Sequence, residues 1–189
     1  MITELNKQLL DHYGRFPLFG IILFTEAHPH VVMMLKDRDY YAALDEITGE
    51  QIAVFATMLF RGEYTYPSPP PGVLADMVPI WKEPAENKKV LTWFDIRDSR
   101  ALPLFVVFTV DGDELYYQLY PLKSESPQEV FNSFREVLSA IGVRLQQSKN
   151  MTPIDVFKMA KWEIKKLRAK QKVRDILETI SVFRGVAGI

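Results

Sequence analysis

The sequence predicts an α/β domain followed by a basic C-terminal helix. Apolar runs of strand length occur at 18–25, 51–59 and 102–110, and a further strand pattern follows at 114–120. Amphipathic segments separate these runs, which indicates a sheet with helices packed on its faces. With 189 residues, of which 48% are hydrophobic, the chain is long enough to bury a core without disulfides.

Helices are predicted where apolar residues recur at helical spacing. The first covers residues 2–13 and ends before Gly14. The pattern from 30 to 49 favours one helix that ends at Gly49. In an alternative interpretation, residues 31–35 form a strand and only 39–48 are helical, and five apolar residues in a row do not distinguish the two.

A proline-rich insertion is predicted at residues 61–84. Its prolines disfavour both helix and sheet hydrogen bonding, so we expect a polyproline-like excursion over the surface. The PxxP spacing within 67–71 can dock into an aromatic groove, or the segment can simply form a rigid loop around the sheet edge. A short helix is predicted next, at 86–97.

Strong local signals mark the second half of the chain. Asp111-Gly112 predicts a two-residue type I′ turn between antiparallel strands. Ser126 and Glu129 form a capping box for a helix at 127–141 that stops before Gly142. Another helix is predicted from Thr152 to about residue 183, broken or exposed near residues 169–172, where its apolar stripe is interrupted.

The order of these elements over residues 1–145 resembles the thioredoxin-like fold. The closest local similarity is the segment from Ile96 to Pro103, followed by the strand, the glycine turn, the second strand and the capped helix. The resemblance implies a central mixed sheet flanked by helices. It also implies that Pro103 is the cis-proline that precedes the third core strand in this family and contributes to a binding site.

The chain departs from the catalytic members of that family. Where they carry Cys-x-x-Cys, this sequence has the segment from Glu26 to His30, and it contains no cysteine at all. Disulfide exchange requires a thiolate, so the redox activity does not carry over. Nucleotide-binding and hydrolase motifs are also absent, so we expect no cofactor, and the scaffold favours a binding or adaptor protein over an enzyme.

The pair of histidines in this segment supplies an alternative. His28 and His30 are two residues apart and Glu26 is close in sequence, a set that suits zinc or another transition metal. A metal-binding protein or an enzyme centred on these residues is therefore the rival hypothesis. The plainer interpretation is a polar loop whose histidines bond backbone groups or face water.

Charge is distributed unevenly along the chain. Residues 1–150 hold fourteen Lys or Arg against twenty Asp or Glu, whereas residues 151–189 hold nine against four. This basic extension predicts binding to the phosphates of a nucleic acid or to an anionic surface. In the alternative interpretation it is a solvated face that complements an acidic surface, either the chain's own or a partner's. The candidate binding residues in it are Lys161, Trp162, Lys165, Lys166, Arg168 and Lys172.

The same extension, residues 151–189, contains an apolar stripe. Ile154, Phe157 and Ile164 belong to it, and Ile180 and Phe183 follow after the polar gap. This stripe docks on the domain or associates with a second copy or another protein, and we expect a homodimer or a protein partner. The sequence has no leader-like N-terminus and no apolar run of about 18 residues, so we expect a cytoplasmic protein without a membrane span.

Overall fold

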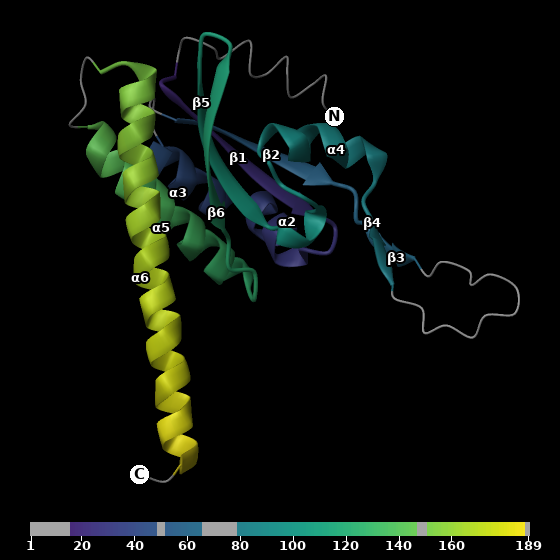
Figure 1. Ribbon diagram of the computed structural model, residues 1–189. Helices are drawn as coiled ribbons and strands as arrows, with labels where there is room; N and C mark the ends of the chain where they lie inside the picture. The colour runs from purple at the N-terminus through teal and green to yellow at the C-terminus, as the bar shows by residue number, and fades with distance from the viewer. Residues whose placement is uncertain (1–15, 49–51, 66–78, 147–150, 188–189) are drawn as a thin grey trace, which may run out of the picture.

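The computed structural model describes residues 16–48, 52–65, 79–146 and 151–187, with the side chains of the last helix described as far as Arg174. It shows an α/β architecture around one four-stranded mixed sheet (Figure 1). The predicted helix at 2–13 lies outside the described residues. The strands of the sheet are β1 (Leu18–Thr25), β2 (Ile52–Leu59), β5 (Leu104–Asp111) and β6 (Glu114–Pro121).

The strand order in this sheet is β2-β1-β5-β6. β1 pairs parallel with β2, with Leu18 opposite Ile52, and antiparallel with β5, which is itself antiparallel to β6. Every residue of β1 is buried, as expected for a central strand that is covered on both faces. The apolar runs therefore predicted the core strands correctly.

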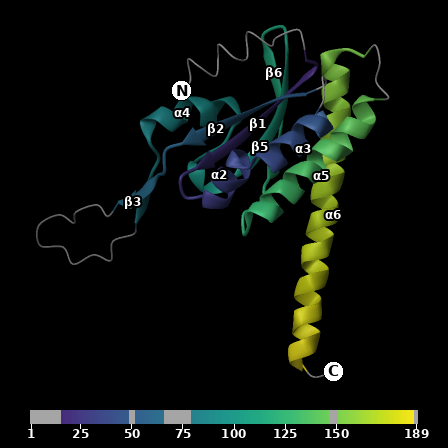
Figure 2. The same cartoon turned by 180° about the vertical axis from the view of Figure 1, so that it is seen from behind.

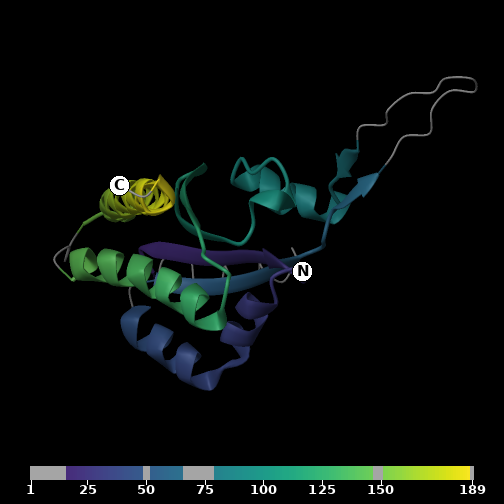
Figure 3. The ribbon, with the colours of Figure 1, turned by 90° about the horizontal axis from the view of Figure 1, so that it is seen from below.

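Helices cover both faces of the sheet. Figure 3 shows helices on both sides of the sheet. Side chains of the sheet accordingly divide between two hydrophobic clusters, with Phe105 packed edge-on against Phe134 at 4.5 Å on one face and Phe94 next to Phe108 at 5.6 Å on the other. The first face carries α2 (Pro29–Lys36), α3 (Arg38–Thr48) and α5 (Pro127–Leu145), and the second carries α4 (Ala85–Trp93).

Two helices occupy the region where the sequence favoured one. α2 ends at Lys36, and Asp37 has extended backbone angles, with φ −80° and ψ 120°. The Asp37 carboxylate then accepts hydrogen bonds from the backbone N–H groups of Asp39, at 2.9 Å, and Tyr40. This is N-capping of α3 by an aspartate, and it makes a second helix start here. Both the single helix and the strand at 31–35 were wrong.

The β5–β6 hairpin was predicted, but its turn lies one residue further along. Asp111 pairs with Glu114, so the turn residues are Gly112 and Asp113. Gly112 has a φ of 60°, whereas Asp113 is not among the described residues with positive φ. A positive φ at the first position alone indicates a type II′ turn, which requires glycine there, and not the type I′ turn that was expected.

The connection from the insertion to β5 is compact. β3 (Glu63–Thr65) and β4 (Ile80–Lys82) pair at the base of the proline-rich insertion, whose residues 66–78 lie outside the described part. α4 ends earlier than predicted, and Asp95 follows in the left-handed region with a φ of 51°. A single 3-10 turn then leads to a cis peptide bond between Leu102 and Pro103, as the resemblance implied.

The two C-terminal helices are longer than predicted. α5 is capped by Ser126, which accepts a hydrogen bond from the Glu129 N–H, but it continues through Gly142 because Leu145 buries its last turn in the core. α6 (Pro153–Ala187) is one continuous helix of 35 residues, about 52 Å long at 1.5 Å per residue. Residues 169–172 do not break it.

Only the first part of α6 packs on the domain. Val156, Phe157, Ala160 and Ile164 are buried in the same cluster as the sheet and α5. The helix therefore begins as part of the core that the sheet and α5 build. Its second part extends past the body of the molecule (Figures 1 and 2). The side chains beyond Arg174, including the predicted apolar positions up to Phe183, lie outside the described residues.

Candidate functional site

The His28 ring is held by hydrogen bonds on both of its nitrogens. The Thr25 backbone N–H donates to Nδ1 at 3.1 Å, and Nε2 lies 3.0 Å from the carbonyl oxygen of Leu102. Because Nδ1 accepts, the proton is on Nε2, which donates to that carbonyl. His28 thus connects the end of β1 to the residue before the cis bond, and neither nitrogen is available for a metal ion.

The other two members of the predicted metal site do not complete it. Glu26 is exposed, and His30 is half-buried with its Nδ1 buried and without a hydrogen-bond partner. Among the residues that the structure describes, no three His, Asp or Glu side chains form a group that could bind a metal ion. The set of Glu26, His28 and His30 is therefore not assembled, because His28 is turned into the fold.

The loop before Pro103 is held from its other side by Glu83. The Glu83 carboxylate accepts hydrogen bonds from the Ser99 N–H at 2.8 Å and from its hydroxyl at 3.0 Å, and also from Trp81 and Asn87. Burial raises the pKa of Glu83, but these hydrogen bonds outweigh it and hold the pKa below its ordinary value. Pro103 itself is buried, so it does not present a contact surface.

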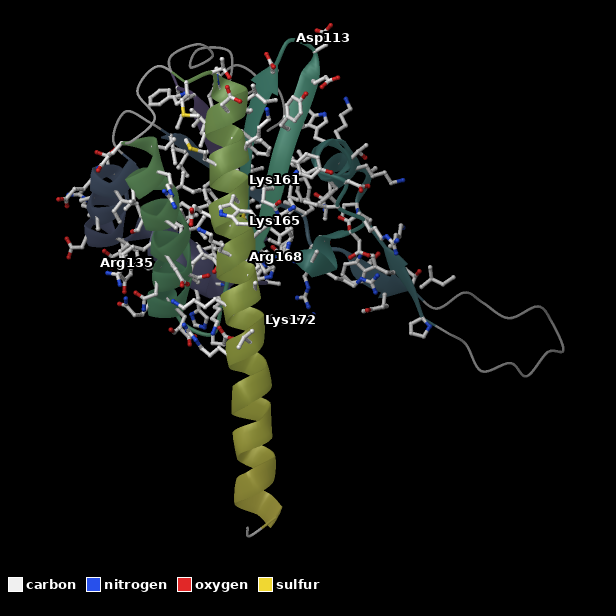
Figure 4. The ribbon with its side chains drawn as sticks, turned by 60° about the vertical axis from the view of Figure 1, so that its left-hand side comes forward. Asp113, Arg135, Lys161, Lys165, Arg168 and Lys172 are labelled. Carbon is white, nitrogen blue, oxygen red and sulfur yellow. The ribbon has the colours of Figure 1, made fainter. Side chains whose placement is uncertain are left out.

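Four cations of α6 form a separate feature, which we call the basic stripe: Lys161, Lys165, Arg168 and Lys172. Their spacing of four, three and four residues places them on one face of the helix. Figure 4 shows them one below another on the side of α6 next to the β5–β6 hairpin. Among the described side chains, none of the four forms an ion pair with a carboxylate. Within the described side chains, the stripe is therefore a row of positive charge without a paired carboxylate.

Trp162 and Lys166 do not belong to this stripe. The Trp162 side chain is 60% exposed, and the Lys166 ammonium lies 5.5 Å from its ring centroid. Lys166 also pairs with Glu163 at 3.2 Å, and Arg144 of α5 pairs with the same carboxylate at 3.0 Å. Burial raises the pKa of Glu163, but these two cations lower it more. The structure thus divides the predicted binding residues of α6 into an internally paired group and a row without a carboxylate partner among the described side chains. In that row, the Lys161 ammonium lies 5.9 Å from the centroid of the Phe157 ring.

A groove at the end of β6 brings one stripe residue next to a distant loop. It has a volume of about 420 Å³, and it is lined by both Arg168 and Arg97, which belongs to the loop after α4. Leu104 and Leu119 form apolar parts of the wall. Asp98 lines it too, but its carboxylate binds Arg100 at 2.6 Å, and hydrogen bonds from Arg100 hold the pKa of Asp98 below its ordinary value.

The sequence analysis missed Arg97 as a site residue. It is separated from Arg168 by 71 positions, and no spacing or motif links the two. What brings them together is the course of α6 along the hairpin, with Tyr116 of β6 next to Phe157 of α6 at 6.1 Å.

Comparisons with known proteins leave the chain without a family assignment. No protein-family model, curated protein or solved structure matches it. Within the part of the chain that the structure describes, no helix has both the length and the apolar character needed to cross a membrane.

Proposed function

We propose that this chain is a non-catalytic binding protein with a thioredoxin-like scaffold, and that the basic stripe is the surface that contacts an acidic protein partner. The observation that supports the binding surface is the row formed by Lys161, Lys165, Arg168 and Lys172, which has no carboxylate partner among the described side chains. Uncompensated charges of one sign on a rigid helix attract a ligand of the opposite sign.

The support for the scaffold is the order of elements. A strand, helices and a second strand precede α4, and then come a cis-proline, the third core strand, a glycine turn, an antiparallel edge strand and a final capped helix. The segment from Glu26 to His30 stands where the family's catalytic cysteines would be, and the chain has no thiol. Binding a partner does not require a thiol, so this role is compatible with the missing cysteines.

A nucleic-acid ligand is the second candidate, because the stripe would also attract phosphates. The groove that Arg168 shares with Arg97 favours a protein instead. Its apolar wall, which includes Leu104 and Leu119, suits side chains better than phosphates. Self-association through the outer part of α6 stays a prediction that sedimentation of the full chain tests.

Fluorescence anisotropy with labelled polyglutamate of about twenty residues tests the proposal. We expect binding that weakens as salt rises, and at least a tenfold loss of affinity when Lys161, Lys165, Arg168 and Lys172 are all changed to Gln. The matched control changes four exposed lysines elsewhere, Lys36, Lys82, Lys88 and Lys89, to Gln and should stay within about twofold of the wild type.

Three outcomes would overturn the proposal. The first is that the wild type fails to bind polyglutamate at low salt, and the second is that the control variant loses as much affinity as the stripe variant. The third outcome is that labelled single-stranded DNA of equal charge binds more tightly than polyglutamate and depends on the same four residues. This third outcome would establish the nucleic-acid candidate instead.

A further inference from the structure

The outer edge of β6 has backbone groups that find no hydrogen-bond partner among the described residues. In a hairpin with a two-residue turn, the residues that flank the turn exchange hydrogen bonds, so on β6 the even-numbered residues from Glu114 bond to β5 and the odd-numbered ones point outward. Two contacts agree with this alternation: the Leu122 N–H bonds back to Pro103, and the Leu119 carbonyl accepts from the Gln118 side chain.

Three residues therefore define an open edge. No hydrogen bond from the described part of the chain reaches the N–H groups of Leu115, Tyr117 and Leu119 or the carbonyls of Leu115 and Tyr117. Such an edge can pair with an extended segment of another chain, which would complete both the donors and the acceptors. Phosphate groups offer acceptors only, so they cannot complement it.

The basic stripe runs beside this edge. Phe157 of α6 lies next to Tyr116, and Arg168 lines the groove that Pro121 closes. From Phe157 to Arg168, α6 rises about 16 Å over eleven residues. From Tyr116 to Pro121, β6 spans about the same length over five residues, at about 3.3 Å per residue. Figures 1 and 4 show α6 and the hairpin side by side, so the cations follow the edge along its length.

The two sides of a strand added to β6 would meet different surfaces. On the side of α6, alternate side chains would approach Lys161 and Lys165. On the other side they would approach Leu104 and Leu119 in the wall of the groove at the end of β6, which Arg168 also lines. Alternate residues on a strand are about 6.6 Å apart, close to the 6 Å rise between Lys161 and Lys165. The geometry fits a segment in which acidic and apolar residues alternate.

Resting on the proposed function, we propose that the partner binds as an extended acidic segment that pairs with the outer edge of β6. Its carboxylates bind the basic stripe, and its apolar side chains pack on the groove wall. A second copy of this chain is disfavoured at this edge, because edge-to-edge pairing would bring two rows of cations together, and lysines beside an edge strand are a means of preventing such pairing.

The test uses the full chain and a labelled peptide of four Glu-Val repeats. A peptide of identical sequence and charge, N-methylated at its two central residues, cannot pair through either edge at its centre. We expect the methylated peptide to bind at least tenfold more weakly. By NMR hydrogen exchange, the unmethylated peptide should protect the amides of Leu115, Tyr117 and Leu119, whereas those of Tyr116 and Gln118 should change little because they already bond to β5.

Two charge reversals on α6 give a matched pair. Arg168→Glu alters the side next to the edge and should weaken the peptide at least tenfold. Lys170→Glu also replaces a cation by Glu, but Lys170 lines a different pocket, together with Glu136 and Arg174. This variant should change the affinity by less than threefold.

Failure of this inference is distinguishable from failure of the proposed function. Equal affinity for both peptides, with no protection of the three edge amides, overturns strand pairing, while stripe-dependent binding of polyglutamate still supports the proposed function. Protection of the same amides that grows with protein concentration in the absence of peptide would show self-pairing and overturn the acidic partner. If anionic vesicles or single-stranded DNA protect these amides more strongly than the peptide does, the acidic protein partner is also overturned.

Discussion

The loop before Pro103 and the basic stripe of α6 both contain the kinds of side chain that suggest a functional site, yet only one of them leaves those groups available. At the loop, His28 and Glu83 use their polar atoms on backbone and side-chain partners within the chain. On α6, the four cations of the stripe have no carboxylate partner among the described side chains. A polar side chain indicates a binding site only when no hydrogen bond or ion pair within the chain already occupies it.

This comparison separates stability from binding. Removing a paired group from the loop leaves another buried polar group unsatisfied, which costs stability. Removing a cation from an exposed helix face leaves nothing unsatisfied. Substitutions in the loop should therefore lower stability and leave binding intact, whereas substitutions in the stripe should weaken binding and leave stability nearly unchanged.

Phe157→Ala should lower the free energy of unfolding by about 3–5 kcal/mol, because it leaves a cavity where the first part of α6 meets the core. Urea denaturation monitored by circular dichroism measures it. The control is Val173→Ala on the exposed part of the same helix, where we expect a change of about 0.5 kcal/mol or less. If both variants lose equally little stability, the helix that carries the stripe is not part of the core.

His28→Ala should destabilise the fold by roughly 1–3 kcal/mol, since it leaves the Leu102 carbonyl and the Thr25 N–H without their partner. Its affinity for polyglutamate at a temperature where it stays folded should equal that of the wild type. Glu26→Ala, two residues away and exposed, is the comparison and should be nearly neutral. Loss of binding without loss of stability would assign His28 to the binding surface and contradict its structural role in the loop.

Glu83→Gln should cost about 1 kcal/mol at neutral pH, because several donors converge on this carboxylate. The folded protein holds the pKa of Glu83 below its ordinary value, so the carboxylate's contribution is fully present above about pH 4.3, the usual value for glutamate. It is lost as the pH falls through the lower folded value. Chemical denaturation at pH 7 and pH 3 should therefore show the variant and the wild type converging at the acidic end.

Changing Lys165 and Lys172 together to Gln should alter stability by no more than about 0.5 kcal/mol, with a slight gain at low salt because like charges on one helix face repel. Thermal unfolding at low and high salt measures it, and added salt should reduce the difference from the wild type. A loss above about 1 kcal/mol would mean that these lysines have structural partners.

Local signals in the sequence predicted most of the elements. Four predicted segments form the strands of the central sheet. α5 begins at Pro127, directly after Ser126, as the capping box predicted. The errors arose where a local signal was present but outweighed by the apolar pattern. Asp37 is an N-cap residue by type, and the continuous run of apolar spacing on both sides of it favoured one helix over two.

The candidate site could be predicted only in part. Helical spacing alone puts Lys161, Lys165, Arg168 and Lys172 on one face, because a helix repeats every 3.6 residues whatever surrounds it. The histidine pair was selected by residue type, and type does not reveal that His28 turns toward Leu102, a residue 74 positions later.

The sequence by itself therefore determined the strands, the helix caps and the row of cations, since all of these depend on residues within a few positions of one another. Only the tertiary structure decided which polar groups are satisfied and which are free. It turned His28 and Glu83 inward onto one loop, and it laid α6 along β6 so that Arg168 and Arg97 line one groove at the end of that strand. Hydrogen bonds and ion pairs form between neighbours in space, and the packing of apolar surface determines which residues become neighbours.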